Sequence, residues 1–266
     1  MVSERLRNRF QDARAEGRPL FLGYVTGGFP RRADTVELML AIEAGGGDVI
    51  EIGVPFSDPL ADGATIQAAN QVALENGVTL GNCMEFVHAA RERGLEAPVL
   101  LMGYYNPILA YGEERTARDA AAAGVDGFIV VDLPPDEAGP FVANCRAYGL
   151  AFVPLVAPTT PEGRVASLAA AADSFLYCVS MTGTTGGRDV TVETLPDFLA
   201  TIRRHTDLPL AVGFGISRRE HVEAVGRIAE AAIVGTAIVA LVDRTAEGER
   251  VEALRAFVAE LTGTGP

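Results

Sequence analysis

Short apolar segments alternate along the chain with longer segments in which apolar residues recur at helical spacing. The short segments are rich in Val, Ile and Leu, which is typical of buried parallel strands. Val36, Met39 and Leu40, which precede the second such segment, illustrate the helical spacing. Eight segments have the strand pattern: Leu20–Thr26, Asp48–Val54, Val99–Gly103, Gly127–Val131, Ala151–Val156, Ser174–Val179, Leu210–Gly213 and Ala232–Val234.

Eight strands separated by helices within 266 residues predict an α/β fold, a single (β/α)8 TIM barrel over residues 1–266. A doubly wound open sheet is the alternative on this pattern alone. Leu6, Phe10 and Ala13 share one face of the first segment, which predicts an extra N-terminal helix that covers the bottom of the barrel. Between the second and third strands there is room for an extended loop, one short helix and one full helix. An extended loop is also expected after the sixth strand.

Charge and cysteine usage restrict the class of protein. The formal net charge of -13 predicts a surface that repels nucleic acid and anionic membranes. No apolar run is long enough to span a membrane, and the charged N-terminal segment does not resemble a signal peptide. Cys83, Cys145 and Cys178 are widely spaced, which fits a reducing cytoplasm better than disulfides or a zinc site. We therefore expect a cytoplasmic protein without a bound metal.

Two acidic residues are candidates for proton transfer. Glu51 interrupts an apolar strand, and strict alternation places it on the face opposite Ile50 and Ile52. Burial on either face would raise its pKa, as is useful in a general acid or base, but a structural role is equally compatible with the pattern. Asp62 lies just beyond the C-terminal end of the same strand, where barrel active sites form. Asp58 lies in the same loop, although aspartate is also common in ordinary turns.

Three glycine-containing segments follow the last three predicted strands: 182–188, 213–217 and 234–237. Phosphate sites in this fold are often built there, because glycine allows the backbone to approach and a helix N-terminus supplies N–H groups. Thr236 would add a hydroxyl. We expect the backbone, rather than a cluster of basic side chains, to hold the phosphate. Tyr177, within the sixth strand, is more often a core residue than a catalytic one.

The segment DVIEIGVPFSDPLADGATIQAA resembles the signature of the tryptophan synthase alpha family. The resemblance continues in order through LLMGYYNPIL, GVDGFIVVDLPPDE, APTTP, YCVSMTGTTGGR and AVGFGIS, so it covers nearly the whole chain. It implies a lyase that splits indole-3-glycerol phosphate into indole and D-glyceraldehyde 3-phosphate without a cofactor. It also implies a partner, the tryptophan synthase beta subunit, in an αββα heterotetramer in which indole passes to that subunit.

The resemblance also assigns site residues. Glu51 and Asp62 would be the catalytic carboxyls, with Asp62 on the indole N–H and Glu51 moving protons. The other assignments are catalytic Tyr177; Gly186, Gly215, Gly235 and Thr236 for the phosphate; Tyr24, Tyr104 and Ile129 for the indole pocket; Thr185 in a lid over 182–190; and Asp58 at the partner interface. Some positions depart from the commonest family pattern: the TGGFP loop, Ala64, Thr184, Thr236 and the segment before the eighth strand. None of these removes a catalytic group.

The sequence leaves three alternative functions open. A stand-alone lyase that releases free indole would use the same catalytic residues. A non-catalytic activator of a beta subunit would have no use for a buried carboxyl such as Glu51. A phosphosugar isomerase is disfavoured because no histidine or lysine lies near a strand end.

Overall fold

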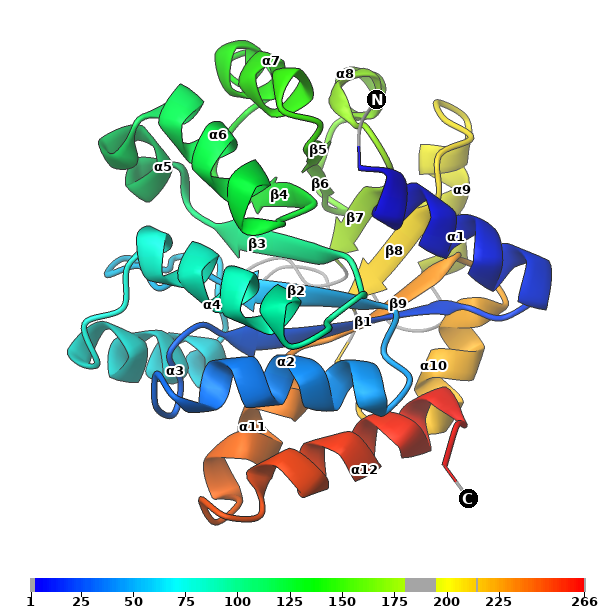
Figure 1. Cartoon of the computed structure of the whole chain (residues 1–266). Helices are drawn as coiled ribbons and strands as arrows, with labels where there is room; N and C mark the ends of the chain where they lie inside the picture. Colours follow the sequence, from blue (N-terminus) through cyan, green and yellow to red (C-terminus); the bar gives the residue numbers. More distant parts are fainter. Residues whose placement is uncertain (1–2, 180–194, 214, 266) are drawn as a thin grey trace.

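A computed structural model describes residues 3–179, 195–213 and 215–265. Its strands are all parallel and form one sheet in the order β5-β4-β3-β2-β1-β9-β8-β7-β6, which curves into a nearly closed barrel (Figure 1). The strands are β1 (Leu20–Thr26), β2 (Val49–Gly53), β3 (Val99–Gly103), β4 (Gly127–Val130), β5 (Ala151–Val153), β6 (Leu155–Val156), β7 (Leu176–Val179), β8 (Leu210–Gly213) and β9 (Ala231–Val234). The predicted (β/α)8 barrel is confirmed, and an open doubly wound sheet is excluded.

The fifth predicted strand is divided into β5 and β6 at Pro154. Proline has no backbone N–H and cannot donate to a strand ladder. β5 pairs with β4, and β6 pairs with β7. The nine observed strands therefore correspond to the eight that the sequence predicts.

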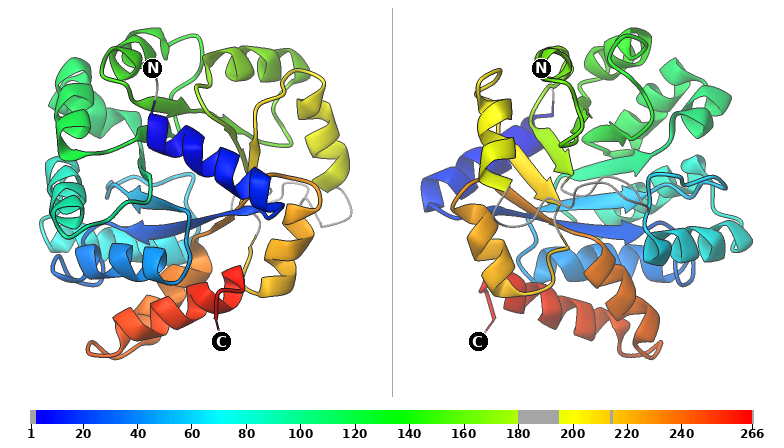
Figure 2. Two further views of the ribbon diagram at one scale, coloured as in Figure 1. Left: turned by 45° about the vertical axis from the view of Figure 1, so that its right-hand side comes forward. Right: turned by 180° about the vertical axis from the view of Figure 1, so that it is seen from behind.

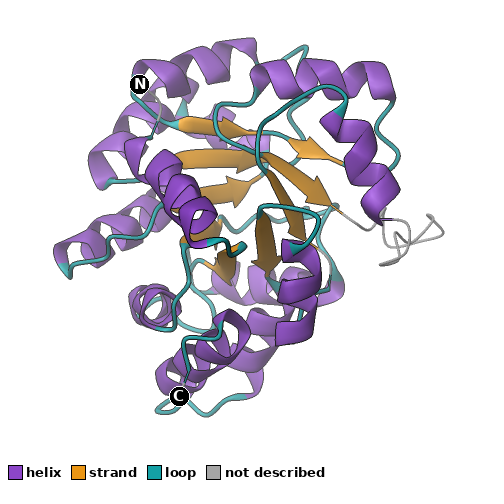
Figure 3. Cartoon of the chain, turned by 90° about the vertical axis from the view of Figure 1, so that its right-hand side faces the viewer, coloured by secondary structure: helices purple, strands orange, loops and turns teal. Residues whose placement is uncertain are grey.

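Helices surround the strands on the outside (Figures 1 and 3). They are α1 (Glu4–Glu16), α2 (Asp34–Ala44), α3 (Ala64–Glu75), α4 (Leu80–Glu92), α5 (Tyr105–Tyr111), α6 (Glu113–Ala123), α7 (Gly139–Ala147), α8 (Glu162–Ala171), α9 (Leu195–Arg203), α10 (Arg219–Gly226), α11 (Thr236–Arg244) and α12 (Arg250–Thr262). The short helix expected after the 55–63 loop is wrong, because α3 has 12 residues and is almost as long as α4. None of these helices is long and apolar enough to cross a membrane. The extended loop expected after the sixth strand falls at 180–194, outside the described residues.

Side chains divide into two apolar clusters according to the face of the strand they occupy. Ile50 and Ile52 of β2 point outward and pack under the helices. Val49 on the same strand points inward and belongs to the interior cluster, together with Leu6 of α1. Because neighbours alternate between faces, Glu51 also points into the barrel. The closed sheet thus settles which face Glu51 occupies.

Helix α1 closes the end of the barrel at which the strands begin (Figure 2). Leu6 and Ala13 are buried within the interior cluster, and the Phe10 ring lies 5.3 Å from the Phe175 ring. The expected covering helix is therefore present, and this end of the barrel is sealed by apolar side chains.

Asp126, immediately before β4, ties the start of the chain to the barrel. Its Oδ1 accepts hydrogen bonds from the Ser3 hydroxyl at 2.8 Å and the Arg5 guanidinium at 3.0 Å. Its Oδ2 accepts from Arg91 at 2.8 Å and from the Val99 N–H at 2.9 Å. This buried carboxylate makes four charge-assisted or backbone hydrogen bonds, so one residue joins α1, α4, β3 and β4.

Candidate functional site

A cavity of about 220 Å³ opens at the C-terminal ends of the strands, opposite α1. Barrel enzymes place their active sites at this end. Six of the residues assigned from sequence line it: Tyr24, Asp62, Tyr177, Gly215, Gly235 and Thr236. They come from segments far apart in the chain, and the closed sheet brings them together.

Glu51 lies on the interior face of β2, behind the wall of this cavity. It is 0% exposed, its register neighbour on β1 is Tyr24, and neither carboxyl oxygen has a hydrogen-bond partner in the described structure. Burial raises the pKa of Glu51 to about 8, and the negative charge of Asp62 adds to the shift. At neutral pH, Glu51 is consequently a buried neutral acid with a proton to give.

Asp62 lies in the loop between β2 and α3 and has partners that Glu51 lacks. Its Oδ2 accepts hydrogen bonds from Tyr104 Oη at 3.3 Å and from Asn70 Nδ2 at 3.2 Å. Burial raises the pKa of Asp62, but both donors oppose this because they stabilise the charged form. The two carboxyls therefore have environments that favour opposite protonation states, as in an acid–base pair.

Two tyrosines flank the carboxyls. Burial, followed by smaller contributions that include the charges of Asp62 and Glu51, raises the pKa of Tyr24 and of Tyr177, so both hydroxyls keep their protons. The Tyr24 hydroxyl lies 3.3 Å from Thr26 Oγ1 and packs directly against Gly53, where an added Cβ would be only 2.0 Å from it. Glycine at this position leaves room for the Tyr24 ring. Tyr177 can donate a hydrogen bond into the cavity.

The far side of the cavity is built from glycines and a helix N-terminus. Gly235 is the N-cap of α11, Thr236 is its first residue, and Gly215 has a positive φ of 46°. Helix N-termini present free N–H groups and a positive dipole end, which suits a phosphate. Within the described residues, no arginine or lysine lines this cavity. Gly186 and Thr185 lie outside the described residues, so their roles stay predictions.

The remaining predicted residues lie around the cavity. Tyr104 lies beside it; its ring stacks on Phe56 and its hydroxyl contacts Asp62. Ile129 is completely buried in the interior cluster and does not line the cavity, so its place in an indole pocket stays a prediction. Asp58 is exposed on the same loop as Asp62, and its carboxylate accepts a hydrogen bond from the Ser57 hydroxyl.

Sequence reasoning missed Asn70. This side chain is only 3% exposed, although it is polar, and it donates to Asp62. The sequence offered one signal: an amide side chain, Asn70, directly after Ala69. The structure shows that both residues lie on the buried face of α3. That signal could not be used without knowing which face of α3 is covered.

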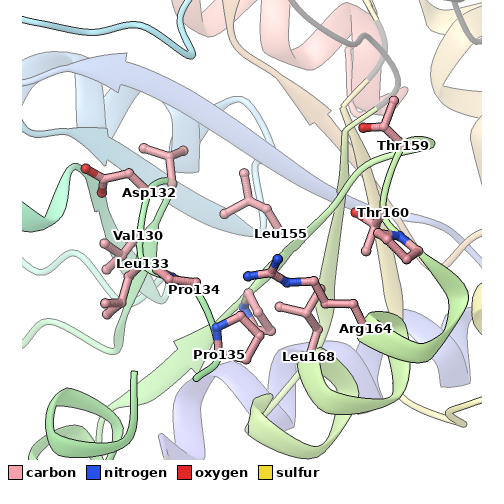
Figure 4. A pocket seen from close by; sticks show the side chains of 13 residues that line it. Val130, Asp132, Leu133, Pro134, Pro135, Leu155, Thr159, Thr160, Arg164 and Leu168 are labelled. Atoms are coloured by element: carbon pink, nitrogen blue, oxygen red, sulfur yellow. The ribbon is translucent and has the colours of Figure 1, made fainter. Parts of the chain in front are cut away.

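A second cavity, of about 430 Å³, lies between the segment after β4 and the start of α8 (Figure 4). It is larger than the first but lacks converging acid–base groups. The Arg164 side chain extends across it toward Leu155, whereas the Asp132 carboxylate points away and accepts a hydrogen bond from the Tyr105 N–H. Chemistry rather than volume therefore identifies the first cavity as the candidate active site.

Comparison with known proteins agrees with this geometry. The family model for the tryptophan synthase alpha chain matches residues 10–262. The tryptophan synthase alpha chain of Roseiflexus castenholzii is 51% identical over 259 residues, covering 97% of this chain and 99% of that protein. Tryptophan synthase of Saccharomyces cerevisiae is 47% identical over 258 residues, which are 97% of this chain but 36% of that protein.

A crystal structure of tryptophan synthase subunit alpha from Legionella pneumophila superposes with a TM-score of 0.91 at 32% identity. The match covers 99% of this chain and 98% of the other. The barrel, the paired carboxyls at its C-terminal end and these relatives lead to one conclusion. This chain belongs to the tryptophan synthase alpha chain family and is a lyase of tryptophan synthesis.

Proposed function

We propose that this chain splits indole-3-glycerol phosphate into indole and D-glyceraldehyde 3-phosphate by retro-aldol cleavage, with Glu51 and Asp62 as the catalytic carboxyls. The observation that carries the proposal is the contrast between them. Glu51 is buried without a hydrogen-bond partner among the described residues and its pKa is raised to about 8, whereas Asp62 receives two hydrogen bonds that favour its charged form. One carboxyl thus gives a proton while the other holds a negative charge.

Glu51 can carry out both proton transfers of the reaction. In its neutral form it donates a proton to C3 of the indole ring. The resulting carboxylate then takes the proton of the C3′ hydroxyl while the C3–C3′ bond breaks and its electron pair returns to the ring. Glu51 ends protonated, as it began, so the step needs no other proton source. No cofactor of this chain is required, because the protonated indole ring accepts the electron pair.

Asp62 complements this step. Protonation at C3 places positive charge on the indole nitrogen, and a carboxylate that accepts its N–H stabilises that charge as it develops. Asp62 lines the cavity and lies close enough to Glu51 to raise that residue's pKa. We assign the Tyr177 hydroxyl to the glycerol chain, since it lines the same cavity.

The two sides of the cavity fit the two ends of this substrate. Tyr24, Ile66 and Met102 offer aromatic and apolar surface near Asp62, which suits the indole ring. The N-terminus of α11, with Gly235 and Thr236, suits the phosphate. We assign Gly215 and Gly186 to the phosphate as well, Tyr104 and Ile129 to the surroundings of the indole ring, and Thr185 to a lid over 182–190 that contacts Asp62.

We further propose that a beta subunit binds beside the cavity and that the assembly is an αββα heterotetramer. Of the three large hydrophobic side chains exposed in the described part of the chain, two lie on segments beside the cavity: Leu60 is 86% exposed and Leu109 is 56% exposed. Leu60 lies between Asp58 and Asp62, and Leu109 is on α5, whose N-cap Tyr104 accepts a hydrogen bond from the Ala61 N–H at 2.9 Å. Large exposed apolar side chains beside a functional site fit a surface that a partner covers.

The length of a relative supports a partner of this kind. This chain covers 36% of the Saccharomyces cerevisiae tryptophan synthase, so that synthase contains much more than an alpha chain. Binding at the loop that carries Asp62 would order it and raise turnover. We place the enzyme in the cytoplasm, which its three buried, unpaired cysteines support.

The test is to incubate the purified chain with indole-3-glycerol phosphate, alone and with increasing beta subunit, and to measure indole and glyceraldehyde 3-phosphate. Glu51→Gln and Asp62→Asn are each expected to lower turnover roughly 100- to 10,000-fold. Glu260→Gln, an exposed substitution on α12, is the matched control and is expected to have no effect.

Each alternative has its own outcome in this experiment. Near-normal turnover in both carboxyl variants would contradict the assigned chemistry. A response that stays flat as beta subunit is added, with no complex in sedimentation, would identify a stand-alone lyase. Activation of the beta subunit without any indole release would identify a non-catalytic activator.

A further inference from the structure

We propose that Asn70 is a positioning residue that holds one oxygen of the Asp62 carboxylate and leaves the other oxygen free for the substrate. The inference rests on the proposed role of Asp62. Asn70 Nδ2 donates to Asp62 Oδ2 at 3.2 Å, and Tyr104 Oη donates to the same oxygen at 3.3 Å. Asp62 Oδ1 accepts no hydrogen bond from the described residues, and Asp62 lines the cavity.

The helix that carries Asn70 also holds the backbone of Asp62. Helix α3 begins at Ala64, directly after the loop, and Gln67 Nε2 donates to the Asp62 carbonyl at 2.8 Å. Asn70 lies eight positions after Asp62, so the first turns of α3 reach back to both the main chain and the side chain of the loop. Helix α3 therefore holds both the backbone and the carboxylate of Asp62, and a defined carboxylate orientation favours catalysis.

The hydrogen bonding of Asn70 points to function rather than to fold stability. The side chain is 3% exposed, and its carbonyl oxygen Oδ1 has no hydrogen-bond partner in the described structure. A buried unsatisfied carbonyl destabilises the folded state, so an apolar residue would serve the fold better. The reverse amide orientation would bring Oδ1 against the Asp62 carboxylate, and repulsion excludes it.

The Asn70 amide also acts on the ionisation of Asp62. Burial raises the pKa of Asp62, while the hydrogen bonds from Tyr104 and Asn70 lower it. Removal of one donor should therefore protonate Asp62 at a higher pH. The titratable groups that interact with Asp62 are Glu51, Tyr24, Tyr104 and Tyr177. The tyrosine pKa values are all raised, so these residues stay neutral while Asp62 titrates.

The variant Asn70→Leu tests the inference, since leucine has the same branching and number of side-chain heavy atoms but no donor. We expect kcat/KM for indole-3-glycerol phosphate to fall roughly 10- to 100-fold at neutral pH. We expect the acid limb of the pH profile to move to higher pH and the melting temperature to stay the same or rise. Gln71→Leu is the matched control, because Gln71 is exposed on the same helix and bonds only to Glu75 among the described residues.

A purely structural role would give a different result: a lower melting temperature with the acid limb unmoved. That outcome, or wild-type kcat/KM in Asn70→Leu, would overturn the inference. Asp62→Asn is measured alongside, because an active Asp62→Asn enzyme would refute the role of Asp62 itself. If leucine prevents folding, Asn70→Ala decides the matter, since it also removes the Asn70 donor to Oδ2 and must shift the acid limb in the same direction.

Discussion

Replacement of Glu51 by glutamine is expected to stabilise the protein at alkaline pH while it abolishes catalysis. The carboxyl is completely buried and has no hydrogen-bond partner among the described residues, so its ionised form is strongly disfavoured in the folded state. Its folded-state pKa of about 8 is above the ordinary value of 4.5. The unfolded chain consequently loses this proton at a lower pH than the folded chain does. The folded state therefore becomes less stable as the pH rises from 4.5 to about 8.

The size of the effect follows from that difference in pKa. At about 1.4 kcal/mol per pKa unit, the shift from 4.5 to about 8 corresponds to about 5 kcal/mol above pH 8. Glutamine stays neutral at every pH. Wild type and Glu51→Gln should therefore have similar stability near pH 5, and the variant should be more stable by about 5 kcal/mol near pH 9.

Urea unfolding at pH 5 and at pH 9 measures this difference. The chain has no tryptophan, so far-ultraviolet circular dichroism is the suitable signal. An increase of about 5 kcal/mol moves the urea midpoint by roughly 2 M. Glu260→Gln, exposed on α12, is the matched control for the loss of one carboxyl at the surface. If Glu51→Gln has the same effect at both pH values, the carboxyl does not titrate as a buried group, and the proton donor assigned here is wrong.

Three further outcomes are expected. The kcat/KM of the wild type should fall as the pH rises through about 8, where Glu51 loses its proton; a flat profile to pH 9 would contradict its role as an acid. Gly53→Ala places a Cβ 2.0 Å from the Tyr24 hydroxyl, so it should cost about 1–3 kcal/mol in urea unfolding and lower activity. Its control is Gly139→Ala, whose Cβ meets no atom within 4 Å and should change stability by less than about 1 kcal/mol. Thr236→Val should raise KM more than it lowers kcat, and an unchanged KM would remove Thr236 from the phosphate site.

Most of the barrel could be predicted because its determinants are local. A buried parallel strand needs a short apolar run, and the predicted limits of β1, β3 and β8 match the structure. The division of the fifth strand at Pro154 was also encoded locally, in the missing N–H. The length of α3 could not be predicted, because the polar residues within it do not show which face of the helix is buried.

The candidate site could be predicted only in part. Glu51 stood out because a carboxylate breaks an apolar alternation, but only the closed sheet shows that it faces the interior. The environment of Asp62 depends on Asn70 and on Tyr104, which is 42 positions away. Such contacts arise from tertiary packing. The spacing of these residues in the sequence does not predict that Asn70 and Tyr104 both donate hydrogen bonds to Asp62 Oδ2.

The anchoring of α1 to Asp126 has a consequence for the order in which the barrel assembles during synthesis. Helix α1 leaves the ribosome before the strands, but the carboxylate of Asp126 that receives the Ser3 hydroxyl lies 123 positions later. The packing of the apolar face of α1 is completed only when the Phe10 ring contacts the Phe175 ring. Until then, the interior cluster that receives Leu6 and Phe10 is incomplete. Helix α1 is therefore made before the strands but is completed as a packed element only after β7, and nascent chains that end before β7 carry a partly uncovered apolar helix that a chaperone can bind.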